Sequence, residues 1–371
     1  MTDDAARFVL GIDPAADESL PGYVARLAQR MLLPTSDFVA AKTGLRQPSL
    51  AFAYASLSGL SALSGIETAR LQAIAYRPTE RGGYYSFLGG VLQREFIHLQ
   101  HRRACPECLR NVGYHRAVWD FALATCCSEH GIRLISRCWA CKRTLTWSHP
   151  DLIKCRCGAH LASRDAMPVS ANERLSQSAL LRLATGDELP TMPAALADCD
   201  RADLVRLVMC LGMFLTGWKR ERRVETLVSA GSNAVAGVVD AGIGCLRDWP
   251  VSLTQFFASE CAGAAARRGK YGARKTLGGF YDWLNIMEPG AIRSALAQVA
   301  IDFIAMDPAL ARQSHRSELV AMPTLADRPV SMKEAGQQIG IGHRKVRRLV
   351  NTGHLSGQAS SGSGTSSSQC D

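Results

Sequence analysis

The sequence predicts a mainly α-helical, multidomain protein with small zinc-ribbon or zinc-knuckle β elements. Two observations lead to this prediction. Cysteine and histidine residues recur at metal-ligand spacing between residues 105 and 157, and segments with helical periodicity lie on both sides of them. In two of these segments a short turn separates two short helices, so we expect helix-turn-helix modules to flank a tandem zinc-binding block.

A chain of 371 residues is long enough for two or three domains. The expected parts are a leader at 1–17, an N-terminal helical, helix-turn-helix-like domain at 18–100, a tandem zinc-binding domain at 101–165, a helical domain at 166–325, a C-terminal helix-turn-helix at 326–355 and a disordered tail at 356–371. We expect the leader to be loose.

The first predicted helix begins after Glu18, in the stretch ESLPGYVARLAQRM. Pro21 falls in its first turn, where a missing backbone N–H is tolerated. The apolar residues that form one stripe at helical spacing are Leu20, Tyr23, Val24, Leu27 and Met31. Arg26 and Arg30 are expected on the exposed side of this helix, where they are available to an acidic partner protein.

Residues 60–76, LSALSGIETARLQAIAY, predict two short apolar helices around a Ser-Gly turn. An ordinary helical hairpin and a DNA-binding helix-turn-helix both fit this pattern.

The cysteine-rich block that follows resolves into two sets of four residues. The first set is Cys105, Cys108, Cys127 and His130, and the second is Cys138, Cys141, Cys155 and Cys157. Zn²⁺ takes four sulfur or nitrogen ligands, and a tight CxxC turn places two thiolates on one metal. We therefore expect two structural Zn²⁺ ions. A catalytic zinc would keep one position open for water, which neither set does.

The ligand assignment has two alternatives. Cys126 neighbours Cys127 and could replace it, and His160 could stand in for Cys155 or Cys157. A packing role fits both Cys126 and His160 better. The remaining cysteines on apolar stretches, expected to be small buried hydrophobes, are Cys199, Cys210, Cys245 and Cys261. The sequence contains no GxSxG or HExxH motif, and we expect a protein that is not an enzyme.

Residues 170–320 alternate Ala- and Leu-rich helical segments with Gly turns, which predicts a helical domain. Within it, RRGKYGARK (267–275) is a basic stretch around a tyrosine. Its cations are Arg267, Arg268, Lys270, Arg274 and Lys275. It reads either as a solvated loop or as a loop that contacts phosphates.

Near the C-terminus, VSMKEAGQQIGIGHRKVRRLVNTGHL (330–355) predicts a second helix-turn-helix. One helix runs from Ser331 to Ile339, and a second follows the Gly turn from His343 to Asn351. The residues on the second helix that we expect to contact DNA are His343, Arg344, Lys345, Arg347 and Arg348. The Ser/Gly-rich residues after 355 predict disorder.

The net charge of +10 points to a polyanionic partner, most simply nucleic acid. The N-terminus, MTDDAARFVLG, lacks the basic region of a signal peptide. The longest uncharged apolar run is about a dozen residues, below the roughly 20 that span a bilayer. We therefore expect a cytoplasmic protein with reduced thiols and no membrane contact.

These features together resemble the TniQ family of transposition proteins, whose relatives include the TnsD target selectors. The resemblance is carried by ESLPGYVARLA, CPECL at 105–109, Tyr114 with Arg116 and Trp119, CSEHGIRLISRCWAC at 127–141 and CRCG at 155–158. It is strongest over residues 18–160.

The resemblance implies a bacterial, nucleoid-associated accessory factor without catalytic chemistry. Such proteins work with a DDE transposase and an AAA+ ATPase regulator. They link that ATPase to a target, which is DNA or, in some branches, a bound recombinase or CRISPR effector complex. A zinc-ribbon helix-turn-helix transcriptional regulator is the main alternative function, and a zinc-dependent nuclease is a distant third.

Overall fold

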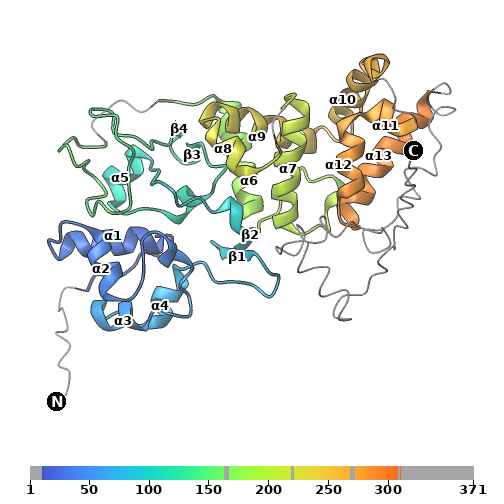
Figure 1. The fold of residues 1–371 in the computed structure, drawn as a ribbon. Helices are drawn as coiled ribbons and strands as arrows, with labels where there is room; N and C mark the ends of the chain where they lie inside the picture. The colour runs from blue at the N-terminus through green and yellow to red at the C-terminus, as the bar shows by residue number, and fades with distance from the viewer. Residues whose placement is uncertain (1–10, 163–166, 219–220, 268–271, 308–309, 311–371) are drawn as a thin grey trace, which may run out of the picture.

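The computed structural model describes residues 11–162, 167–218, 221–267, 272–307 and 310 (Figure 1). The N-terminal module contains α1 (Leu20–Arg30), α2 (Ser36–Lys42), α3 (Ser58–Ser64) and α4 (Thr68–Ala73). It is followed by β1 (Tyr84–Phe87), β2 (Gly90–Gln93), α5 (Pro106–Val112), β3 (Cys126–Cys127) and β4 (Ile132–Arg133). The middle helices are α6 (Ala171–Ala184), α7 (Arg201–Leu215), α8 (Val224–Ser229) and α9 (Ser232–Arg247). The last helices are α10 (Val251–Ala262), α11 (Gly272–Leu277), α12 (Gly279–Ile286) and α13 (Ala291–Met306).

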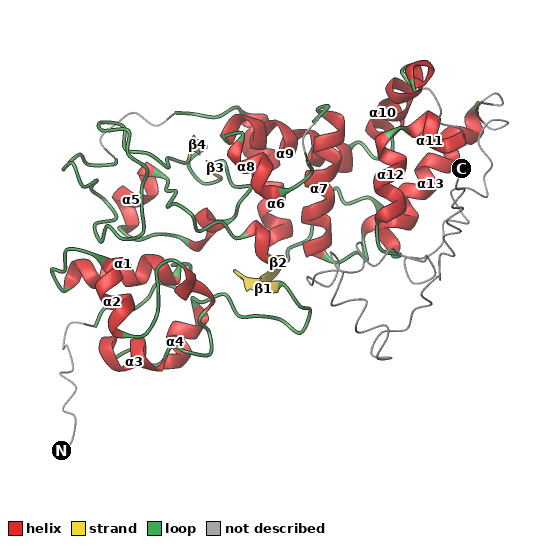
Figure 2. Ribbon diagram, viewed as in Figure 1, coloured by secondary structure: helices red, strands yellow, loops and turns green. Residues whose placement is uncertain are grey.

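These elements follow one another along an elongated molecule (Figure 1). The N-terminal module lies at one end, against a loop-rich segment that contains α5, β3 and β4, and α10–α13 lie at the other end. Strands in the described residues form two short antiparallel hairpins, and helices dominate the rest (Figure 2). The prediction of a mainly α-helical, multidomain protein with small β elements is confirmed.

Helix α1 begins and packs as its sequence predicts. The Ser19 side chain caps it by accepting a hydrogen bond from the Gly22 N–H, and Pro21 lies in the first turn. Leu20, Tyr23, Val24 and Leu27 are buried in a core that belongs to the N-terminal module. The two helices predicted over 60–76 are α3 and α4, which are separated by Gly65 in the left-handed conformation (φ +73°).

The β1–β2 hairpin connects this module to the middle helices. Gly90, the first residue of β2, lies against the backbone where α6 ends, so that a Cβ atom there would overlap Ala184 and Thr185. A side chain at position 90 would therefore push the hairpin off α6.

Helices α7 and α9 cross at unusually close range. A Cβ atom on Gly212 of α7 would overlap the carbonyl oxygen of Val238, and one on Gly242 of α9 would overlap the carbonyl oxygen of Val208. The two helices thus touch backbone to backbone at both glycines, and this contact anchors the middle of the molecule.

A second hydrophobic core runs without a break from the loop-rich segment to the last helices. It includes Phe87 of β1, Trp119, Leu207 of α7 and Leu296 of α13. The metal-ligand block and the helical part, which we expected as separate domains, therefore share one core.

Some predicted parts lie outside the described residues: 1–10 of the leader, the C-terminal helix-turn-helix and the tail. Residues 11–17 differ from the expectation of a loose leader. Asp13 forms an ion pair with Arg70 (2.7 Å), and Asp17 forms one with Arg116 (2.5 Å). Across the described ranges, every helix is too short or too polar to cross a membrane.

Candidate metal centres

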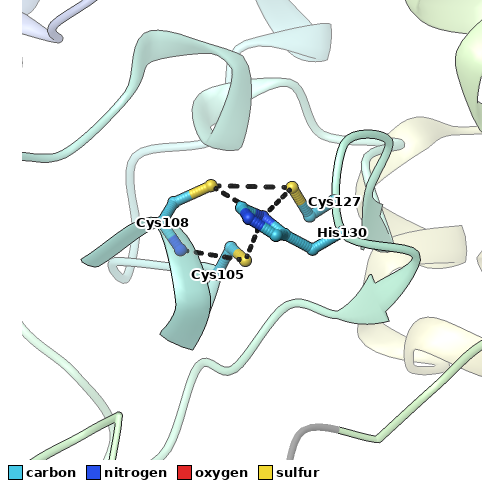
Figure 3. A group of neighbouring side chains, drawn as sticks. All are labelled: Cys105, Cys108, Cys127 and His130. Atoms are coloured by element: carbon cyan, nitrogen blue, oxygen red, sulfur yellow. Dashed lines mark hydrogen bonds between the residues drawn. The ribbon is translucent and has the colours of Figure 1, made fainter. Parts of the chain in front are cut away.

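The first set of predicted ligands comes together in space, and we call it the first cluster (Figure 3). Cys105 is the N-cap of α5 and Cys108 lies in the first turn of that helix. Cys127 ends β3, and His130 lies in the tight turn that Gly131 closes with φ +64°. A helix start and a hairpin turn thus each supply two ligands, which is what the CxxC and CxxH spacings predict.

The distances within this cluster fit a tetrahedral metal site. Around a zinc ion with bonds of about 2.3 Å to sulfur and 2.0 Å to nitrogen, the ligand atoms are about 3.8 Å apart for two sulfurs and about 3.5 Å for sulfur and nitrogen. The Cys108 and Cys127 sulfurs are 3.7 Å apart. His130 Nδ1 lies 3.6, 3.3 and 3.5 Å from the sulfurs of Cys105, Cys108 and Cys127.

The second set also comes together and forms the second cluster. The Cys138 and Cys157 sulfurs are 3.7 Å apart, as are those of Cys141 and Cys155. These two pairs correspond to opposite edges of a tetrahedron. Cys157 is exposed, so this cluster lies nearer the surface than the first. Both clusters can hold a metal ion, and all four positions of each are protein atoms.

Neither alternative ligand belongs to a cluster. Cys126 is buried and lines a cavity of about 140 Å³, and its sulfur is not one of the four grouped ligand atoms of the first cluster. His160 uses its Nδ1 to accept a hydrogen bond from the Ala162 N–H (3.3 Å). Cys199, Cys210 and Cys245 are buried and reduced, while Cys261 is half-buried.

Arg116 connects the first cluster to the N-terminal module. Its guanidinium contacts the Cys108 sulfur (3.8 Å), the Glu129 carboxylate (2.5 Å) and the Asp17 carboxylate (2.5 Å). Asp17 also accepts a hydrogen bond from the Tyr114 hydroxyl (2.6 Å). One side chain thus links a ligand, the CxxH turn and the segment before α1.

A buried polar network also connects the N-terminal module to the segment around the first cluster. Ser19 Oγ hydrogen-bonds His115 Nδ1 (2.9 Å), and His115 Nε2 lies 3.8 Å from an oxygen of Asp120. The Tyr76 hydroxyl donates to the other Asp120 oxygen (2.6 Å). Ser, His and Asp are the residues of a hydrolytic triad, but here all three are buried and the serine meets the wrong ring nitrogen for that role. The network is therefore structural.

Burial controls the protonation of this network. It raises the pKa of Asp120 to about 8, against smaller opposing effects of Tyr76 and Arg103. Burial also lowers the pKa of His115 well below its ordinary value. Asp120 is thus protonated and His115 neutral at neutral pH. Ser19, His115 and Asp120 were not predicted as a group, because Ser19 lies 96 positions before His115 and the three residues share no spacing motif.

Of the two arginines predicted to bind a partner protein, one is held by an ion pair within the fold and the other is exposed. Arg26 is not free on the surface: it forms an ion pair with Glu18 (2.6 Å) and donates to the Asp13 carbonyl. Burial raises the pKa of Glu18, and the contact with Arg26 opposes that rise. Arg30 is exposed, as expected.

The basic stretch at 267–275 is only partly available to a ligand. Arg267 donates to the carbonyls of Glu260 and Lys275 and forms an ion pair with the Glu260 carboxylate. Arg274 pairs with Asp282 (2.7 Å), and Lys275 is half-buried. The structure thus uses Arg267 to hold α10 against α11. Arg268, Lys270 and the C-terminal cations from His343 to Arg348 lie outside the described residues.

Comparison with known proteins identifies one family. The family model described as TniQ matches residues 9–134, which cover the N-terminal module and the whole first cluster. No curated protein matches the chain. The expected resemblance to the TniQ family is confirmed over residues 9–134.

Proposed function

Because residues 9–134 match the TniQ family model, we propose that this chain is a non-catalytic accessory protein of transposition that selects the target and recruits an AAA+ ATPase regulator of the transposase. The match carries this proposal. Within it, the target is DNA or a complex already bound to DNA, such as a recombinase or a CRISPR effector complex.

The metal in both clusters is zinc in this proposal. Three thiolates with one imidazole, and four thiolates, are ligand sets that favour Zn²⁺, and the distances between the ligand atoms fit tetrahedral bonds. Zinc bound there would hold the ligand turns at fixed positions. This role is structural, because the protein supplies four ligands to each ion and leaves no position for a substrate.

The surroundings of the first cluster support the same conclusion. A zinc-dependent nuclease needs carboxylates at an open metal position. The nearest acidic side chain, Glu129, is engaged by Arg116 at 2.5 Å. Its carboxylate reaches the Cys108 sulfur at 4.0 Å, but the ion pair with Arg116 occupies it, which disfavours the nuclease alternative.

We assign the contact with the ATPase to the N-terminal module, and Arg30 is the residue of that surface whose substitution tests the assignment. Arg30 ends α1 and is exposed, whereas Arg26 serves the fold through Glu18. DNA contacts are assigned to Arg344, Arg347 and Arg348 with their neighbours His343 and Lys345, and to Arg268, Lys270, Arg274 and Lys275. Arg267 is left out of this set because the Glu260 carboxylate and two backbone carbonyls hold its guanidinium. Arg274, by contrast, is exposed and, among the described residues, pairs with Asp282 alone.

A pull-down tests the proposal. The full chain is immobilised, and its cognate AAA+ ATPase is applied with ATP and duplex DNA. We expect retention of the ATPase, and a loss of roughly fivefold or more for Arg30→Glu because the charge of the contact is reversed. The matched control is Lys42→Glu, the same change at an exposed site on α2. Residues 11–17 stay in place because Asp17 holds Arg116.

Two outcomes separate the alternatives. If the wild-type chain retains no ATPase, the proposal that it recruits the ATPase is wrong. A chain that instead binds a palindromic site as a dimer is a transcriptional regulator. If the ATPase binds but Arg30→Glu and Lys42→Glu behave alike, the docking surface lies away from α1.

A further inference from the structure

The segment that holds the second cluster is strongly basic. We call residues 136–162 the second knuckle. It contains five Lys and Arg residues and a single acidic residue, Asp151. The five cations are Arg137, Lys142, Arg143, Lys154 and Arg156, and all are exposed. None was among the residues that the sequence analysis assigned to DNA.

The second knuckle has 27 residues folded around one ligand cluster, so these cations share one small segment. Four flank the ligand turns directly, since Arg137 and Lys142 neighbour Cys138 and Cys141, and Lys154 and Arg156 neighbour Cys155. Backbone bridges pair Arg137 with Thr144 and Lys154 with His160. The half-exposed Trp139 is held among them by a hydrogen bond from its indole N–H to the His160 carbonyl (3.0 Å).

These cations lack acidic partners within the described residues. Arg156 donates to the neutral Ser148 hydroxyl, and Lys142 to the Trp139 carbonyl. Asp151, the one nearby acid, uses its carboxylate to accept the N–H groups of Ile153 and Lys154. Elsewhere on the surface, the arginines that pair with carboxylates include Arg81, Arg110, Arg206, Arg223 and Arg247.

The five exposed cations do not serve to neutralise the negative charge of the second cluster. Four thiolates on one Zn²⁺ leave a net charge of about −2. In the first cluster, Arg116 contacts a ligand sulfur directly, at 3.8 Å. No such cation–sulfur contact is found for the second cluster in the described chain. There the buried Arg102, which is 1% exposed and interacts with Cys155, lies on the inner side instead.

From this arrangement we propose that the second knuckle binds the phosphate backbone of duplex DNA, without reading its sequence. Exposed, unpaired Arg and Lys side chains are the groups that bind phosphates. The inference rests on the proposed function, which places this chain on a DNA target, and it names the surface that makes the contact.

The salt dependence of DNA binding tests this inference. The full-length, zinc-loaded chain is titrated with fluorescent 30-bp duplex DNA of arbitrary sequence at several salt concentrations. In the triple variant Arg137→Gln, Arg143→Gln, Lys154→Gln, the steepness of the slope of log K against log salt should fall by roughly 2.7, at about 0.9 per phosphate contact. Affinity near 0.1 M salt should fall about tenfold or more. The metal content should stay unchanged.

The matched control removes three charges from the helical part, in the triple variant Arg182→Gln, Arg223→Gln, Arg247→Gln. These side chains are exposed and lie on α6, before α8 and on α9. We expect the control to keep the wild-type slope. Equal losses in both variants would overturn the inference, because net charge alone would explain them. An unchanged slope in the knuckle variant, or a fall in its metal content, would overturn it as well.

Two further results have distinct meanings. If wild-type chain binds no DNA at any salt concentration, the DNA part of the proposed function fails together with this inference. If the wild-type chain binds DNA and the knuckle variant binds it with the same salt slope, the inference fails but the DNA part of the proposed function stands. Tighter binding of duplex RNA than of DNA, lost in the knuckle variant, would overturn the assignment to DNA.

Discussion

At the scale of single residues, the joint between α1 and the first cluster depends on Arg116 and Asp120. Arg116 is held between the carboxylates of Asp17 and Glu129, and it also contacts the Cys108 sulfur. Asp120 is buried, forms no direct ion pair with an arginine or lysine of the described residues, and accepts a hydrogen bond from Tyr76. Its position therefore requires the protonated carboxyl group.

Asp120 should make the stability of the protein depend on pH. Burial raises its pKa to about 8 in the folded protein, while in the unfolded chain it ionises near pH 4. As pH rises from 4 to 8, the unfolded state loses this proton first, so the stability from this group falls, and above about pH 8 it falls no further. Between pH 6.5 and 8, we expect a loss of roughly 1–2 kcal/mol in the wild type.

Asp120→Asn should remove this loss, because the amide resembles the protonated acid and can still accept from Tyr76. Urea unfolding at several pH values measures it. The charged or titratable groups around Asp120 are Tyr76, Arg103 and His115, and His115 stays neutral over this range because burial lowers its pKa. Equal pH dependence in wild type and variant would show that Asp120 is already ionised at neutral pH.

At the scale of elements, two contacts hold the helical part together. Arg267 crosses from the end of α10 to the last carbonyls of α11, where a cation also interacts favourably with the helix dipole. Gly212 and Gly242 let α7 and α9 approach until their backbones touch. The apolar residues around this crossing form the centre of the second core.

Gly212→Ala should therefore destabilise the protein, since the new methyl group would overlap the Val238 carbonyl and force the helices apart. We expect a loss of about 1–3 kcal/mol in the free energy of unfolding. The matched control is Gly237→Ala on α9, where the added Cβ meets no atom within 4 Å. There alanine should stabilise by about 0.5–1 kcal/mol, because it favours the helix. Similar effects of both substitutions in urea unfolding would contradict the close crossing.

At the scale of the whole molecule, the two clusters lie where the N-terminal module meets the rest of the chain. Beside the Ser19–His115 contact, the Ser36 N–H donates to the Ser148 carbonyl of the second knuckle (3.1 Å). The segment between these contacts has little regular secondary structure (Figure 2). Bound zinc would supply on the order of 10 kcal/mol of folding free energy to it.

Metal analysis of the purified chain should give two zinc ions, and Cys108→Ser should lower this number to one. Cys199→Ser is the control, because Cys199 is buried outside both clusters and its loss should leave two ions in place. Chelation should raise hydrogen exchange in residues 101–162 and at the start of α1, before α7 and α9 respond. One ion or none in the wild type would contradict the two-site assignment.

Local spacing in the sequence was sufficient to predict the ligand clusters, the α1 stripe and the helices of the middle region. Each depends on residues within a few positions of one another: Cys105 and Cys108 on one turn, or Leu20 and Val24 on one face. Residues 224–239, part of the predicted helical domain, span α8 and the start of α9, and Gly231 separates these two helices. These features follow from backbone geometry, which acts over short separations.

Only the tertiary structure decided which polar side chains are free. Arg26 and Arg267 look like exposed cations in the sequence, yet Glu18 and Glu260 neutralise them in the fold. Ser19 meets His115 across 96 positions, and Asp120 meets Tyr76 across 44. Such contacts follow from the path of the whole chain, because burial forces each polar group to find a partner wherever the fold brings one near. The cations of the second knuckle, by contrast, are exposed and have no acidic partner among the described residues.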